Sequence, residues 1–201
     1  MTEQEKRKGG GGKLTRSETV TVRLDPKLRY LAELAARKQR RTLSSFIEWA
    51  VEDSLRQVML YQGTGYNNDE SISFADEAGK LWDVDEAERF ARLAITYPDL
   101  LTHQDQEIWK LLNDCYLLLP AKLRDRYTGQ LSWDWPILED QVFPTLRRYW
   151  PDLMMSYSEG TAACRQWVQR TQEQVVAGKV YPGFAVHAKQ EPEFDDSDIP
   201  F

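Results

Sequence analysis

The sequence predicts a mainly α-helical protein with two folded parts and a disordered acidic tail. Near the N-terminus, a short stretch of alternating apolar and polar residues precedes two amphipathic helices. After a segment rich in glycine and asparagine, helical periods return and are separated by prolines. From these patterns we expect a flexible basic arm at 1–17, a first domain at 18–60, a linker at 61–74, a small all-helical domain at 75–177 and an extended acidic tail at 178–201.

The composition favours a cytoplasmic protein. Of the 201 residues, 29% are charged and 41% are apolar. There is no run of about eighteen apolar residues that would predict a membrane span, and the N-terminus lacks the apolar core of a signal peptide. Two cysteines, Cys115 and Cys164, and two histidines, His103 and His187, have no metal-ligand spacing. We therefore expect reduced thiols, no metal, no cofactor and no membrane partner.

Charge is divided unevenly along a chain whose net charge is −6. Residues 1–58 contain thirteen lysines and arginines against eight acids, a net charge of +5. Residues 59–201 contain thirteen against twenty-four, a net charge of −11. A basic head joined to an acidic body predicts that the head binds an anionic partner.

The arm at 1–17 places lysines and arginines on both sides of four consecutive glycines. Glycine loses much conformational entropy when it is ordered, so we expect the arm to be flexible. In this setting Lys13 and Arg16 are candidate phosphate contacts, on the backbone or along a minor groove. The alternative is a solvated tail without a partner.

Residues 18–24 alternate strictly between apolar and polar side chains, which predicts a half-buried β-strand. One face of this strand consists of Val20, Val22 and Leu24. The opposite face consists of Thr19, Thr21 and Arg23. Such a strand needs another to satisfy its backbone hydrogen bonds.

Two helices follow the predicted strand. Asp25-Pro26 supplies an N-cap and a proline at the first helical position of a helix that runs to about Arg40. A turn at Thr42-Leu43 leads to a second helix, with Ser44 as its expected cap. Because one strand and two helices are too small to pack a core, we expect a second copy whose strand pairs antiparallel across a twofold axis.

Residues 19–55 resemble the ribbon-helix-helix family, which includes the MetJ, Arc and CopG repressors. The strand phase, the Asp-Pro cap and the turn at 42–45 all agree with that family. The resemblance implies a homodimer whose two-stranded ribbon enters the major groove of double-stranded DNA.

On this resemblance, the outward face of the ribbon reads the bases and the start of the second helix holds a phosphate. The chemistry agrees, because arginine binds guanine O6 and N7, and threonine bonds base edges or contacts a thymine methyl. The alternative is that the polar face is only the solvent-exposed side of a strand in the dimer. The implied base contacts are Thr19, Thr21 and Arg23. The implied phosphate contacts are Ser44, Ser45 and Phe46.

The acidic body shows several helix signals and no internal repeat. Asp83 with Glu86, and Thr102 with Asp105, each predict a capping box at a helix start. We expect shorter helices near 121–128 and 137–149, with Pro136 and Pro151 as boundaries, and a longer one at about 159–176.

This domain contains six tryptophans and no enzyme signature. Exposed rings can stack single-stranded bases, but the surrounding residues are acidic, so we expect most rings in the core or at a protein interface. Trp133 and Trp135 are the exception, since one short loop cannot easily bury both. There is no G-x-S-x-G, P-loop, H-E-x-x-H or Cys-His pair, and we expect no catalytic residues.

The last seven residues resemble the C-terminal tip of bacterial single-stranded-DNA-binding protein (SSB), with Ser197 as a departure from its acidic pattern. The resemblance implies a tail whose terminal ring and carboxylate are bound by replication and repair enzymes. The alternatives are a solubilising tail and a tail that competes with DNA for the basic head. The implied partner-binding residues are Asp195, Asp196, Asp198, Ile199, Pro200 and Phe201.

Together these features predict a homodimeric, sequence-specific double-stranded-DNA-binding protein, nucleoid-associated in a bacterial cytoplasm. It would act as a transcriptional regulator or as a replication or maintenance factor of a mobile element. Its tail would recruit proteins that bind the SSB tip. The alternatives are an antitoxin that represses its own promoter, and an accessory protein of a relaxosome at a transfer origin.

Overall fold

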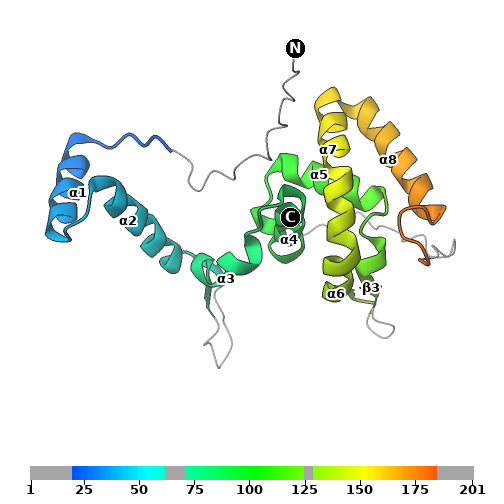
Figure 1. Cartoon of the computed structure of the whole chain (residues 1–201), viewed down its shortest axis with the longest axis horizontal. Helices are drawn as coiled ribbons and strands as arrows, with labels where there is room; N and C mark the ends of the chain where they lie inside the picture. The colour runs from blue at the N-terminus through cyan, green and yellow to red at the C-terminus, as the bar shows by residue number, and fades with distance from the viewer. Residues whose placement is uncertain (1–19, 62–70, 125–128, 185–201) are drawn as a thin grey trace, which may run out of the picture. The chain divides into compact units, whose positions relative to one another are not determined.

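The computed structural model describes residues 20–61, 71–124 and 129–184 (Figure 1). Contacts divide the chain into two compact units, unit 1 (Met1–Ala75) and unit 2 (Asp76–Phe201). The described part is mainly helical, as the sequence predicted. None of the helices in these ranges is long and apolar enough to cross a bilayer.

Unit 1 contains a first helix, α1 (Pro26–Lys38), that begins where the sequence predicted. The Asp25 carboxylate accepts a hydrogen bond from the Leu28 N–H at 3.0 Å, and a proline occupies the first helical position. The helix ends at Gln39, and Arg40 then adopts a left-handed backbone with φ 57°. This residue reverses the chain towards the second helix.

The second helix, α2 (Leu43–Gln57), is capped by Thr42 and not by Ser44. The Thr42 hydroxyl accepts a hydrogen bond from the Ser45 N–H at 3.1 Å. Ser44 lies in the first helical turn, because a cap accepts from the N–H three residues ahead and Thr42 has the extended backbone that this requires. α1 and α2 pack against each other.

Residues 20–24, the described part of the predicted β-strand, form no strand in the single chain. Residues 20–24, drawn in blue before α1 in Figure 1, pair with no other strand of the described chain. A strand is stabilised by the ladder that it forms with a neighbour, and the described part of unit 1 pairs no strand with this segment.

A two-stranded hairpin includes both ends of the segment that the sequence predicted as a linker. β1 (Met59–Tyr61) pairs antiparallel with β2 (Ile72–Ser73), so the ends of the 61–74 segment are ordered strands. The Phe74 N–H donates to the Val58 carbonyl at 3.1 Å, and α3 (Phe74–Leu81) starts directly after β2.

Unit 2 is built around a helical hairpin. α7 packs against α8 and against α4, while α5 packs against α8 (Figure 1). Short 3₁₀ turns lie at Pro98–Leu100 and Leu119–Ala121. The four main helices are α4 (Glu86–Thr96), α5 (His103–Asp114), α7 (Phe143–Glu159) and α8 (Thr161–Val176).

The capping box at α5 is confirmed, whereas the one expected at Asp83 is wrong. Thr102 and Asp105 exchange both hydrogen bonds of the box. At α4 the cap is Asp85, which accepts from the Glu88 N–H at 3.0 Å. Asp83 instead accepts from the Asp85 N–H at 2.7 Å and orders the turn before the helix.

In the described part of the helix predicted near 121–128, residues 122–124 form a strand, so unit 2 is not all-helical. β3 (Lys122–Arg124) pairs antiparallel with β4 (Leu131–Trp133). A 3₁₀ turn that contains Pro120 directly precedes β3, and Gly129 has the positive φ, 70°, that only glycine adopts freely. These two breakers favour a hairpin over a helix.

A helical rod runs without a break from Trp135 to Glu159, past the proline at which we expected it to stop. It consists of α6 (Trp135–Ile137), a π-helical turn (Leu138–Val142) and α7. The Phe143 N–H donates five residues back to Leu138, immediately before Pro144, which has no N–H to donate. Pro151 lies inside α7, and the packing of the neighbouring Trp150 and Leu153 offsets the lost hydrogen bond.

The core of unit 2 extends beyond residue 177, where the sequence placed the start of the tail. Val180 and Tyr181 are buried in the same cluster as Trp167 and Phe143. The Tyr181 hydroxyl donates to the Leu117 carbonyl at 2.7 Å. Burial of the apolar side chains Val180 and Tyr181 therefore holds the segment after α8 against the core of unit 2.

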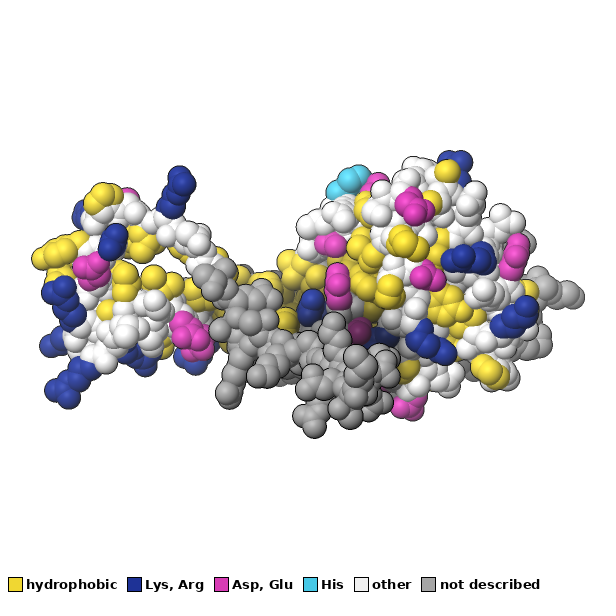
Figure 2. All heavy atoms as spheres, turned by 45° about the horizontal axis from the view of Figure 1, so that its top comes forward, with side chains coloured by type: hydrophobic (Ala, Val, Ile, Leu, Met, Phe, Trp, Pro, Cys, Tyr) yellow, Lys and Arg dark blue, Asp and Glu magenta, His cyan; other side chains and the backbone are white. Residues whose placement is uncertain are grey.

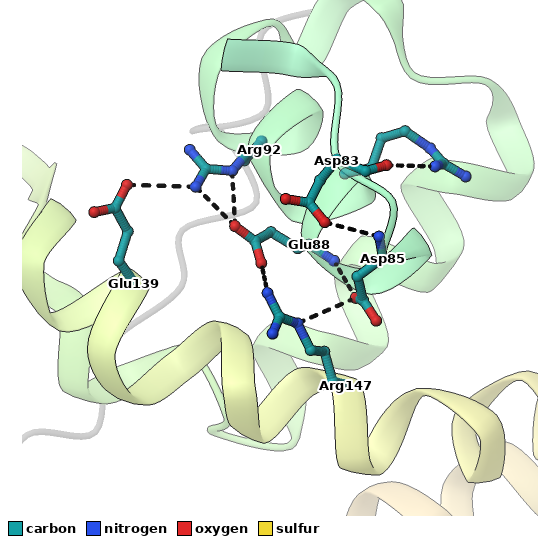
Figure 3. A network of polar contacts seen from close by, with 7 residues as sticks. Asp83, Asp85, Glu88, Arg92, Glu139 and Arg147 are labelled. Carbon is teal, nitrogen blue, oxygen red and sulfur yellow. Dashed lines mark hydrogen bonds and ion pairs between the residues drawn. The ribbon is translucent and has the colours of Figure 1, made fainter. Parts of the chain in front are cut away.

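A polar network joins α4 to α7 (Figure 3). The buried Glu88 carboxylate accepts from Arg92 at 2.7 Å on one oxygen and from Arg147 on the other. Arg92 also contacts Glu139 at 3.3 Å, and Arg147 lies 3.7 Å from Asp85. A buried carboxylate is tolerated only when it is paired in this way.

Candidate nucleic-acid interface

The segment before α1 exposes both of its faces. Thr21 and Arg23 are exposed, as base-contacting residues must be. Val20 is 79% exposed and Val22 is 58% exposed, although both are apolar. Thr19 lies outside the described residues. A free chain gains nothing from two exposed valines, so their position predicts a partner surface.

The apolar side chains of both helices continue this uncovered surface, which Figure 2 shows as hydrophobic spheres open to solvent on unit 1. The only buried residue of α1 is Ala36, and α2 has none. We call this surface the open apolar face of unit 1. It consists of Val20, Val22, Leu28, Tyr30, Leu31, Leu34, Val51, Leu55 and Val58.

The start of α2 offers backbone N–H donors for a phosphate at only some of the predicted positions. The Ser45 N–H donates to the Thr42 hydroxyl, and the Phe46 N–H donates to the Thr42 carbonyl at 2.9 Å. The N–H groups of Leu43 and Ser44 precede them in the first turn, where intrahelical acceptors are missing. Of the three predicted residues, Ser44 therefore has the backbone donor best placed for an anion.

Positive charge gathers around the turn between α1 and α2. Arg37 and Lys38 lie in the last turn of α1, and Arg40 and Arg41 follow directly. The Arg41 guanidinium lies 5.7 Å from the centroid of the Trp49 ring, which holds it near the start of α2. Over residues 20–61 there are eight lysines and arginines against five acids.

The remaining predicted site residues lie outside the described residues. These are the arm residues Lys13 and Arg16, and the tail residues Asp195, Asp196, Asp198, Ile199, Pro200 and Phe201.

The tryptophans of unit 2 belong mostly to its packing. Trp150 and Trp167 are buried, and Trp109 and Trp133 pack partly buried against the core. Trp82 is 66% exposed and Trp135 is 38% exposed. An arginine lies over one face of each of these two rings, Arg89 at 4.9 Å and Arg92 at 5.9 Å from the ring centroid. Each ring therefore has at most one face left on which a base could stack.

Cys115, a buried cysteine of unit 2, is not activated as a nucleophile. Burial raises the pKa of Cys115 to about 12, so its thiol stays protonated at neutral pH. Burial also lowers the pKa of the nearby Lys122, whose ammonium donates to Asn113 at 2.8 Å. Within the described residues, no group of acids, histidines and cysteines could hold a metal ion.

Comparisons of the chain with protein-family models, with curated proteins and with solved structures found no match.

Proposed function

We propose that this protein is a homodimer that binds a specific site on double-stranded DNA through unit 1. One observation carries the proposal: the alternating segment 20–24 and both helices share an open apolar face, while Thr21 and Arg23 are exposed on the same segment. A regulator of transcription or of replication fits this activity.

The open apolar face supports the dimer. Its valines and leucines are 40–79% exposed in one chain, and burying the exposed part of each contributes about 1 kcal/mol or more. A second copy buries the same face on both chains, and its 20–24 segment supplies the strand partner that the single chain lacks. With the valines turned towards the helices, Thr21 and Arg23 point outward from the paired ribbon.

The charge of unit 1 supports DNA as the ligand. Its basic residues crowd the turn before α2, beside the backbone donors of the first helical turn. Phosphates bound there would orient the ribbon, and the ribbon would supply the base contacts. An arginine on the outward face of a ribbon is suited to guanine, whose O6 and N7 it binds with two hydrogen bonds.

The test is binding of the full chain to duplex sites selected from a random library. Arg23→Ala should weaken binding to the selected site by about 1–3 kcal/mol and relax the preference at one base pair. Arg56→Ala is the matched control, because Arg56 is exposed, lies in unit 1 and already contacts Asp53 at 3.7 Å. Equal affinity of wild type and Arg23→Ala would contradict readout by the ribbon.

The proposal extends to residues 195–201 through their resemblance to the SSB tip. The acids and the apolar Ile199 and Phe201 are the features that support it. A direct assay with an enzyme that binds the SSB tip, such as exonuclease I, should show binding that is lost when Phe201 is removed. Binding that is unchanged without Phe201, or absent from both forms, would leave a DNA-binding protein without this recruiting role.

A further inference from the structure

The helical hairpin of unit 2 has a hollow that is open to solvent. None of its lining residues belongs to the proposed DNA interface. Its volume is about 340 Å³, within the size range of small-ligand sites. It lies between α7 and α8, which are joined at Gly160 (Figure 1). The lining residues are Arg148, Tyr149, Asp152, Arg170 and Gln174.

Two half-buried residues form a fixed pair within this lining. The Tyr149 hydroxyl donates to the Gln174 side-chain oxygen at 2.8 Å. With its oxygen engaged, the Gln174 amide presents its nitrogen, a donor of two hydrogen bonds, as its remaining polar group. The hydrogen bond joins α7 to α8 and so holds the amide in place.

Two guanidinium groups add to these donors. None of the ion pairs among the described residues includes Arg148 or Arg170. Arg148 makes one long hydrogen bond, to the Thr145 hydroxyl at 3.4 Å. By contrast, Arg92 and Arg147 of the same unit each contact two carboxylates. The hollow thus gathers two guanidiniums that form no ion pair, against one carboxylate, Asp152, in a part of the chain that is acidic overall.

We propose that this hollow binds a small oxyanion, a carboxylate or a phosphate group. Two guanidiniums and an amide match the planar, multiply accepting geometry of such groups. The Asp152 carboxylate on the same wall disfavours a densely charged ligand, because it repels every added negative charge. The anion has two possible sources: a diffusible metabolite, or the carboxylates of the acidic stretch at 191–201 of this chain.

The experiment titrates the full chain with inorganic phosphate, and separately with acetate, by calorimetry in a chloride buffer. Arg148→Gln and Arg170→Gln each remove one guanidinium from the hollow. Arg165→Gln is the matched control, because Arg165 is an exposed residue of α8 outside the lining. A further form carries Asp195→Asn, Asp196→Asn and Asp198→Asn and so removes acidic charge from the chain's own candidate ligand.

We expect saturable binding of phosphate or acetate that Arg148→Gln or Arg170→Gln weakens about tenfold or more, while Arg165→Gln leaves it unchanged. Equal binding by wild type and the asparagine form indicates a diffusible ligand. Binding that is stronger in the asparagine form indicates that the chain's own carboxylates occupy the hollow.

The proposal is overturned if neither wild type nor the asparagine form binds either anion saturably. It is also overturned if Arg165→Gln weakens binding as much as the lining variants do, because the effect would then be one of net charge. Arg148→Lys and Arg170→Lys keep the positive charge and control for a loss of binding through unfolding. We expect both variants to bind the anion more weakly than wild type, because lysine lacks the bidentate geometry of arginine. Unchanged affinity in both lysine variants would also overturn the proposal.

Discussion

Two buried threonines of unit 2 differ in what their hydroxyl groups contact. Thr145 accepts a hydrogen bond from Arg148 at 3.4 Å. Thr171 is 1% exposed, and its hydroxyl has no hydrogen-bond partner among the described residues. A buried hydroxyl without a partner costs free energy, whereas a paired one is close to neutral or favourable. The same residue type therefore has opposite effects on stability at these two positions.

Replacing each threonine by valine, which has nearly the same shape, tests this difference. Thr171→Val should raise the free energy of unfolding by about 1 kcal/mol, because it removes an unpaired hydroxyl. Thr145→Val should lower it by about 1 kcal/mol or less, because Arg148 loses a hydrogen-bond partner. Urea unfolding of the full chain, followed by tryptophan fluorescence, measures both values. A loss of stability in Thr171→Val would show that its hydroxyl is paired in solution.

At the scale of elements, helix starts were predictable where one side chain decides them. The Asp25-Pro26 start of α1 and the Thr102–Asp105 box of α5 were both visible in the sequence, because each is a local hydrogen-bonding pattern. The caps at Thr42 and Asp85 were missed by two residues, since neighbouring serines and aspartates offer the same chemistry.

Elements that depend on distant contacts were not predictable in the same way. A proline inside a helical pattern usually ends the helix, yet α7 continues through Pro151 because the residues around it are buried by other helices. The β3–β4 hairpin and the buried Tyr181 are likewise fixed by packing. In the candidate interface, the alternation of residues 20–24 was visible in the sequence. The exposure of the whole apolar face could be seen only in the folded structure.

The contact between α4 and α7 depends on Glu88, which pairs residues of both helices. Glu88→Gln should lower the free energy of unfolding by roughly 1–3 kcal/mol, because two guanidiniums lose their buried carboxylate. Glu139→Gln is the matched control at the exposed end of the same network, where a loss of about 1 kcal/mol or less is expected. Urea unfolding compares the two. Equal losses would show that the buried carboxylate contributes no more than the exposed one.

On the scale of the whole molecule, apolar surface and charge are divided between the units. Unit 2 has a packed core, whereas unit 1 leaves most of its apolar side chains in water. The chain is also basic up to residue 58 and acidic after it. A second copy bound to unit 1 would bury the open apolar face and double the positive charge offered to DNA. The affinity for DNA should then depend on salt, falling with a log–log slope of about −0.9 per phosphate contacted.

The dimer is tested by placing a charge on the open apolar face. Val51 is 55% exposed in the single chain, so Val51→Glu should change the stability of a monomer by only about 0.5 kcal/mol. In a dimer that buries this face, the same change buries an unpaired carboxylate and should convert the protein to monomers.

Met155→Glu provides the control, because Met155 is 58% exposed on unit 2 and outside the proposed interface. Sedimentation equilibrium of the full-length forms should give twice the chain mass of 23.4 kDa for wild type and Met155→Glu, and the single mass for Val51→Glu. Val51→Glu should also lose specific DNA binding, because one chain supplies only half of the ribbon. A wild-type protein that sediments as a monomer at micromolar concentration would contradict the dimer, and with it the ribbon.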